Sequence, residues 1–433
     1  MKKHAIFRLG AWGILSATVL IHAQETMQPP VVTGYASYEA GQVVKGYGSD
    51  GEIKNAWIQK ATIALGADAK VSSYLHLLVT GEANLTFSFK YNTQFIDQLR
   101  ETQVPRTAFS LIRGEGLFSL LNDRLQIEAG FFPYRTSPDA RNLGEFLFRS
   151  AVSPVYFANT FDRLNSDILG IRIGHTAGAV FHHDLLFNTE IYNYPMEDFS
   201  LSYIARYDIP RIIEVGGGVS LYRLLALKDY YTTPHQSANI RSLDNPRAVI
   251  DSITGLPVTV YDTSYYSFAG PKFMFRFAFD PKGLFNASIF GDEDLKLYAE
   301  AAMIGIERDS LYYDNPLSRL PIAVGFNIPA FRILDVLAAE MEYCDSPWPN
   351  SYKQGFEYGL PLPQKADMYA LSRFKWSFYA KRHIGNNCWI IGQVARDHLI
   401  PLTHSFSMGV QDRTDVLVRI TDWWWILKMK FAF

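Results

Sequence analysis

Residues Trp423–Phe433 read WWWILKMKFAF and end the chain. In an extended strand, successive side chains point to opposite faces. One face of this strand would be wholly apolar and would end in an aromatic residue, whereas the other would carry two lysines. Such a segment fits a strand with lipid on one side and a wet lumen on the other. The apolar face would hold Trp425, Leu427, Met429, Phe431 and Phe433, and the other face Trp424, Ile426, Lys428, Lys430 and Ala432.

The same segment resembles the terminal strand of bacterial outer-membrane β-barrels of the porin-like type, which typically ends in Phe after alternating apolar residues. The resemblance covers this segment alone and identifies no particular member. It implies an all-β fold, a closed antiparallel transmembrane barrel, and a place in the outer membrane of a bacterial cell, surrounded by its lipid. Porins of this size are often trimers, so the resemblance also implies a possible homotrimer.

The chain begins with the pattern of a secretory signal peptide. Lys2, Lys3 and Arg8 form a basic head, an apolar run follows over 11–21, and Ala23 is a small residue at a plausible cleavage point. The apolar run is too short to span a bilayer as a helix. We expect residues 1–23 to be a signal peptide and 24–433 to form the barrel domain; a buried N-terminal helix is the alternative.

The composition favours many strands over helical spans. Aromatic residues make up 15% of the chain, and the hydrophobic residues alternate with polar ones instead of forming runs of 18 or more after the first 23 positions. A net charge of −2 gives no reason to expect a nucleic-acid partner. Cys344 and Cys388 would lie on opposite sides of a membrane, so we expect them to be unpaired.

Segments of period-two alternation, long enough for a tilted strand to cross a membrane, recur along the chain. We expect about 16 strands. An even number of strands places both termini of the barrel domain in the periplasm, as is usual for a single-chain bacterial barrel. The segments are about 31–45, 55–69, 72–90, 106–121, 124–134, 166–176, 179–193, 197–208, 211–228, 264–280, 294–308, 319–328, 331–345, 369–382, 387–399, and a last one that ends at residue 433.

The connections between these segments test the pattern independently. Outer-membrane barrels have short periplasmic turns and long extracellular loops. Most connections at one end are two to four residues long, with one longer exception at about 281–293 that begins with a short helical turn at 281–286. Most connections at the other end are long, at about 91–105, 135–165, 229–263, 309–318, 346–368 and 400–420.

The face opposite each apolar face would line the lumen, and two interpretations of its charges are open. Acidic residues dominate the third to fifth and seventh strands and basic residues the tenth, fourteenth and sixteenth, which would segregate charge across the pore and set ion selectivity. Alternatively, the charges pair between strands, as Arg113 and Glu115 could on one strand. The expected pore-lining residues are Glu82, Arg113, Glu115, Glu128, Arg172, Lys272, Arg276, Arg373, Lys375, Lys428 and Lys430.

The connection at about 135–165 carries more aromatic residues than an exposed loop needs. We expect it to fold into the barrel and narrow the pore, as constriction loops do in porins, with a short helix at about 139–149. A cap packed over the outer rim is the alternative. In the first case Arg141, Glu145 and Arg149 would be the constriction residues.

No other pattern points to chemistry. His182 and His183 are adjacent, so their side chains would point to opposite faces of a strand and could not hold one metal together. No nucleophile elbow or phosphate-binding loop occurs. We therefore expect a porin-like channel for passive diffusion of small hydrophilic or ionic solutes, with no cofactor, metal or catalytic residue. The alternatives are a barrel enzyme of the lipase or protease type and a closed structural or surface-binding barrel.

Overall fold

The structure is a computed structural model. The predicted signal peptide and residues 150–165 of the predicted constriction loop lie outside the residues that it describes. Among the described residues, no helix is long and apolar enough to cross a membrane. The described residues are 29–48, 51–88, 106–149, 166–178, 180–189, 199–210, 212–225, 239–251, 255–267, 270–285, 288–304, 320–345, 373–397, 417 and 419–433.

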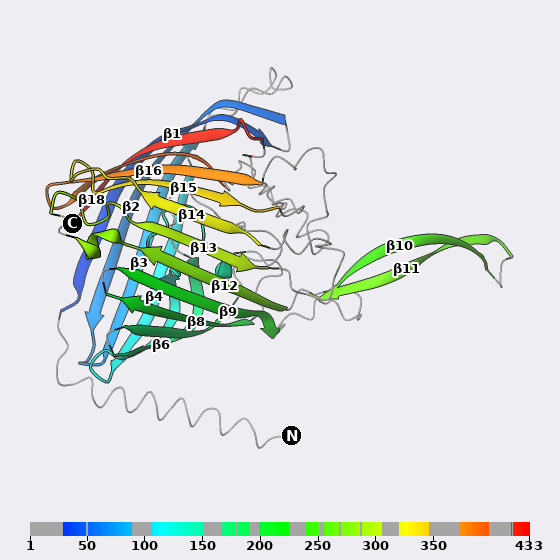
Figure 1. The fold of residues 1–433 in the computed structure, drawn as a ribbon, viewed down its shortest axis with the longest axis horizontal. Helices are drawn as coiled ribbons and strands as arrows, with labels where there is room; N and C mark the ends of the chain where they lie inside the picture. The colour runs from blue at the N-terminus through cyan, green and yellow to red at the C-terminus, as the bar shows by residue number, and fades with distance from the viewer. Residues whose placement is uncertain are drawn as a thin grey trace.

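Sixteen antiparallel strands close into one barrel, in the spatial order β1-β18-β17-β16-β15-β14-β13-β12-β9-β8-β7-β6-β5-β4-β3-β2 (Figure 1). This confirms the predicted fold class and the predicted number of strands. The strands are β1 (Val31–Gly48), β2 (Gly51–Lys70), β3 (Leu75–Ser88), β4 (Arg106–Leu120), β5 (Leu125–Tyr134), β6 (Ser166–Ala177), β7 (Phe181–Thr189), β8 (Phe199–Ile209), β9 (Ile213–Leu225), β12 (Gly270–Phe279), β13 (Leu297–Met303), β14 (Ile322–Asn327), β15 (Val336–Tyr343), β16 (Phe374–Ile384), β17 (Cys388–Arg396) and β18 (Trp423–Ala432).

The last strand closes the barrel, and its two faces lie as the sequence predicts. β18 pairs with both β17 and β1, and Glu39 of β1 lies opposite Lys428. The side chain of Trp424 is 1% exposed and faces inward, whereas Leu427 is 54% exposed and faces outward. The barrel is therefore apolar outside and polar inside, the reverse of a water-soluble protein.

The two ends of the barrel differ in their connections, as predicted. Short connections join β2 to β3, β4 to β5, β6 to β7, β8 to β9 and β16 to β17. The connection from β14 to β15 covers residues 328–335, so it is longer than the predicted two residues. The longer exception at the same end carries a short 3-10 helix, η2 (Pro281–Leu284), capped by the Asp280 side chain. The first barrel strand begins and the last one ends at this short-connection end, where the Ala432 backbone N–H donates to the carbonyl of Asn387.

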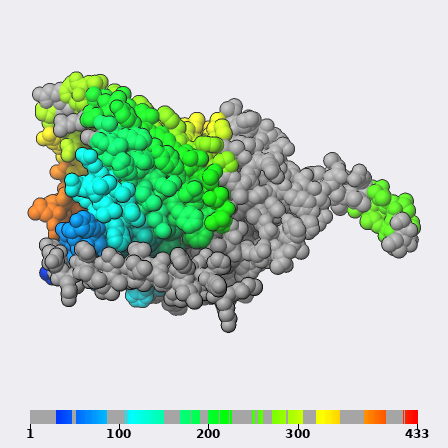
Figure 2. Space-filling view, turned by 90° about the horizontal axis from the view of Figure 1, so that it is seen from below, coloured from blue at the N-terminus to red at the C-terminus, as the bar shows by residue number. Residues whose placement is uncertain are grey.

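One predicted loop contains two strands that the sequence analysis did not identify. β10 (Asn239–Ile250) and β11 (Pro257–Ser267) form a separate two-stranded sheet that stands away from the barrel (Figure 1) and ends at one extremity of the molecule (Figure 2). The predicted connection at 229–263 and the predicted strand start at 264 are therefore wrong, and β12 begins at Gly270. Period-two alternation marks a strand but does not say which sheet it joins.

Candidate functional site

The chain enters the lumen directly after β5. Gly130 on this strand has a φ of +131°, a backbone conformation that other residues rarely adopt. A Cβ there would lie 2.3 Å from the carbonyl oxygen of Gly114 on β4. Beyond this point Phe132 and Tyr134 point inward and are buried. Residues 135–149, which we call the crossing segment, follow.

The crossing segment spans the full width of the barrel. Around the ring of sixteen strands, β5 and β15 are eight strands apart in either direction, so they face one another. Glu340 on β15 accepts hydrogen bonds from three consecutive backbone N–H groups of the segment, those of Arg141, Asn142 at 2.8 Å and Leu143 at 3.0 Å. The hydroxyl of Tyr298 donates to the same carboxylate at 2.8 Å.

Two more glutamates fix the shape of the segment. Glu300 on β13 accepts from the Phe146 backbone N–H at 2.7 Å and from the Ser137 hydroxyl. Glu145 folds back within the segment and accepts from the backbone N–H of Thr136 at 2.9 Å and from its hydroxyl at 2.7 Å. Buried carboxylates need such donors, because an unpaired charge in a dry site is costly.

Apolar contacts press the segment against one side of the lumen. A short 3-10 helix, η1 (Phe146–Phe148), contacts β9, β12 and β13. Its side chains join a buried cluster formed by inward apolar residues of the wall. The cluster holds Phe132, Tyr134, Leu143, Phe146, Leu147, Ile168, Leu186, Ile204, Met274, Ala302, Ile304 and Ala323, with Phe148 packed against it.

The far side of the segment is tied to the wall by charged and polar groups. The Asn142 side chain donates to Asp397, just beyond β17, at 2.6 Å. Arg141 pairs with Glu293 at 2.7 Å. The Arg149 guanidinium lies 3.3 Å from Glu342 on β15. The segment therefore occupies the sector from β6 round to β17.

The three predicted constriction residues lie in this segment but differ in access to solvent. Glu145 is 3% exposed and Arg149 is 1% exposed, so both hold the segment in place. The Arg141 side chain is 14% exposed. The predicted helix at 139–149 is wrong, because within this range only Phe146–Phe148, in η1, is helical. Hydrogen bonds to Glu340 take up the backbone N–H groups of Arg141, Asn142 and Leu143.

Eight of the predicted pore-lining residues make charged or polar contacts, which lie within one strand, between neighbouring parts of the wall, or with the crossing segment. Lys428 pairs with Glu39 at 3.0 Å. Arg172 pairs with Glu128 at 3.1 Å and with Asp184 at 2.9 Å. The remaining contacts join Arg113 to Glu115, Lys272 to the carbonyl of Arg149, Arg276 to Glu214 and Asp139, and Lys375 to the carbonyls of Asp397 and Leu417. These contacts favour pairing over segregated walls of charge.

Six of these pore-lining residues are buried, namely Glu115, Glu128, Lys272, Arg276, Lys375 and Lys428. The others keep more access to solvent. Glu82 accepts from the Tyr35 hydroxyl at 2.6 Å, and the ammonium of Lys430 lies 3.8 Å from the centre of the same ring. Arg373 lies directly before β16 at the long-loop end, where it pairs with Asp345.

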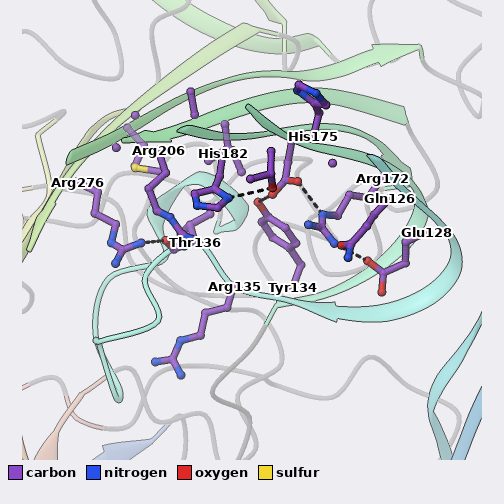
Figure 3. Close-up of a pocket in the computed structure, with 18 of the residues that line it drawn as sticks. Gln126, Glu128, Tyr134, Arg135, Thr136, Arg172, His175, His182, Arg206 and Arg276 are labelled. Carbon is purple, nitrogen blue, oxygen red and sulfur yellow. Dashed lines mark hydrogen bonds and ion pairs between the residues drawn. The ribbon is translucent and has the colours of Figure 1, made fainter. Parts of the chain in front are cut away.

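A cavity of about 320 Å³ lies between the start of the crossing segment and the wall strands β5 to β9 and β12 (Figure 3). The predicted residues Glu128, Arg172 and Arg276 line it. The pore-lining prediction missed Tyr134, Arg135 and His182, which also line it. Strand alternation indicates an inward direction for His182. No local signal shows that the Tyr134 hydroxyl reaches Asp184 on β7 or that Arg135, directly after β5, lines the same cavity.

No metal-binding group of three or more His, Cys, Asp or Glu side chains is found in the described part of the chain. His183 pairs with His175 at 2.9 Å on the outer face, whereas His182 contacts Thr176 on the inner face, as their alternation predicts. Neither Cys344 nor Cys388 forms a disulfide.

No protein-family model and no curated protein matches the chain by sequence. Several solved structures are similar to it in shape. The low-pH structure of Pseudomonas putida OprB aligns at a TM-score of 0.43 and 11% identity, covering 98% of this chain and 97% of that chain. A triple mutant of Rhodopseudomonas blastica porin aligns at 0.42 and 8%, and Salmonella typhi OmpF in complex with daunomycin at 0.43 and 10%, each covering 94% of this chain and 100% of the other. The barrel itself rests on the strand pairing of this chain.

Proposed function

We propose that the protein is a channel in the bacterial outer membrane through which small hydrophilic solutes diffuse passively, without a chemical reaction. The observation that carries the proposal is a closed barrel with an apolar exterior and a charged interior. Lipid cannot pair with backbone N–H and C=O groups, and closure leaves no sheet edge unpaired. On the outer face Phe275 is 56% exposed and Leu65 is 55% exposed, which suits lipid and not water.

The crossing segment would set the width of the passage. It packs against the sector from β6 to β17, so solutes would pass between it and the opposite wall of β1 to β4 and β18. That wall carries Glu82, Arg113 and Lys430, which keep access to solvent. Of the three predicted constriction residues, we assign the pore-facing role to Arg141 and an anchoring role to Glu145 and Arg149.

Swelling of liposomes that contain the refolded chain tests the proposal. Sugars of increasing size should enter at decreasing rates and stop at a size limit. A chain shown to be folded and inserted that admits no sugar would contradict the proposal. Assembly into a homotrimer is a further expectation, which the mass of the detergent-solubilised particle tests.

A further inference from the structure

Two histidines face one another on the outer wall of the barrel, at the short-connection end. His175 on β6 and His183 on β7 are directly opposite in the strand register. The Nδ1 atom of His175 lies 2.9 Å from the Nε2 atom of His183. His182, the neighbour of His183 in the sequence, contacts Thr176 on the inner face and takes no part in the pair.

The pair lies near the boundary between lipid and water. β6 ends two residues after His175, and β7 begins two residues before His183. Phe181 and Tyr207 lie opposite one another in the next outward row, and aromatic residues gather at this boundary in membrane barrels. Both histidines are half-buried. A charged ligand costs much less at this depth than at the middle of a membrane.

Aromatic contacts hold the His183 ring in position. Phe181 stacks on it with ring centroids 5.3 Å apart, and the ring of Tyr203 on β8 lies 5.9 Å from it. The two imidazole rings meet edge to face, at an interplanar angle of 80°. Figure 3 shows His175 directed away from the side chains gathered in the cavity, so the pair belongs to the outer surface and not to the lumen.

The spacing of the two nitrogens fits a metal ion. Metal–nitrogen bonds to histidine are about 2.0–2.1 Å long, so two such bonds at a right angle hold their nitrogens roughly 2.9 Å apart. A tetrahedral angle would hold them roughly 3.3–3.4 Å apart. The observed 2.9 Å therefore matches the right angles of square-planar and tetragonal geometry, which Cu²⁺ and Ni²⁺ prefer.

The same distance suits a hydrogen bond, in which one ring donates its N–H to the other. Coordination requires the donating ring to move its proton to its other nitrogen, so that both facing nitrogens present lone pairs. Among the described residues, no hydrogen-bond partner occupies that other nitrogen in either ring. Water at the membrane boundary can therefore accept the proton's hydrogen bond.

We propose that His175 and His183 form a binding site for a divalent transition metal on the outer wall, with Cu²⁺ favoured over Zn²⁺. Imidazole is a ligand that suits these metals. The pair supplies two ligands, so water or a lipid phosphate would fill the remaining positions. The proposal goes beyond the channel, because it needs the closed wall but no passage of solutes.

Titration of the untagged, refolded chain in detergent micelles with copper chloride, followed by electron paramagnetic resonance of the copper, tests the site. The parent chain should give a saturable copper spectrum that shows two imidazole nitrogens. His175→Gln and His183→Gln should each remove one nitrogen from that spectrum. Changes beyond the ligands weaken metal sites about 10- to 100-fold, so the loss of a ligand should weaken binding by at least about tenfold.

His182→Gln is the matched control, because it removes the adjacent imidazole from the inner face and leaves the pair intact. It should bind copper as the parent chain does. A folded parent chain whose copper spectrum lacks two imidazole nitrogens would overturn the site. So would copper binding that neither His175→Gln nor His183→Gln weakens, or that His182→Gln weakens equally. Zinc chloride in a parallel titration should bind more weakly, and zinc binding at least as tight as that of copper would overturn the assigned geometry.

Discussion

Glu340 is the residue on which the position of the crossing segment depends most directly. Replacing it with alanine would leave three backbone N–H groups and the Tyr298 hydroxyl without their acceptor in a buried site. Each buried unsatisfied donor costs about 1–3 kcal/mol, so Glu340→Ala should lower the free energy of unfolding by about 3 kcal/mol. Urea titration of the refolded chain measures this. Glu52→Ala, which removes a solvent-exposed ion pair with Lys54, should change the free energy of unfolding far less than Glu340→Ala does. Equal losses in the two variants would contradict the anchoring role.

The backbone conformation at Gly130 leads to a second prediction for a single residue. Gly130→Ala combines an unfavourable φ with a Cβ placed 2.3 Å from a backbone oxygen, so it should destabilise the barrel by on the order of 2 kcal/mol or more. Gly178→Ala also has a positive φ but meets no atom within 4 Å, and should cost about 1 kcal/mol. Thermal unfolding of both variants gives the comparison. A Gly130 variant as stable as the Gly178 variant would show that β5 does not need this bend.

At the scale of elements, an ion pair joins the crossing segment to the connection between β12 and β13. Burial alone would raise the pKa of Glu293, but the hydrogen bond from Lys296 at 2.9 Å and the charges of Lys296 and Arg141 lower it below its ordinary value. A lowered pKa stabilises the fold above the unfolded value, and the contribution disappears as the pH falls through the folded value. The stability difference between the parent chain and Glu293→Gln should therefore be full at pH 7 and shrink below about pH 4. Unfolding measured across this range tests it, and an equal difference at pH 3 and pH 7 would refute the pairing.

The sequence predicts the wall strands well, but it does not predict which residues contact one another inside the barrel. Alternation identifies all sixteen wall strands because each of them carries apolar side chains on its outward face. The sequence analysis placed β10 and most of β11 in a loop, and it assigned the end of β11 to the wall strand that follows. Glu340 and Arg141 are 199 positions apart, and their contact depends on how far the crossing segment reaches over the lumen. The alternation of residues along one strand does not say how far the crossing segment reaches. The sequence therefore indicates that Glu145 and Arg149 belong to this segment, but not that both side chains are buried in it.

At the scale of the whole molecule, the closed barrel and the crossing segment depend on one another. Closure leaves the outer surface free to be apolar, and the inward carboxylates Glu300 and Glu340 then hold a segment from β5 across the lumen. Most of the charged side chains inside the barrel are paired. Pairing lowers the free-energy cost of burying these charges, so the lumen can remain polar. In the channel that we propose, Arg141 and the opposite wall would be the groups that a passing solute meets.

Single-channel conductance in a planar bilayer tests this account most directly. The refolded chain should give stable open currents, and Arg141→Ala should enlarge each conductance step because it removes a side chain from the narrow region. Arg382→Ala, which changes the same charge outside the lumen, should leave the step unchanged. Silence from a chain shown to be folded and inserted would contradict the channel, and steps of equal size in Arg141→Ala and the parent chain would contradict the placement of the constriction.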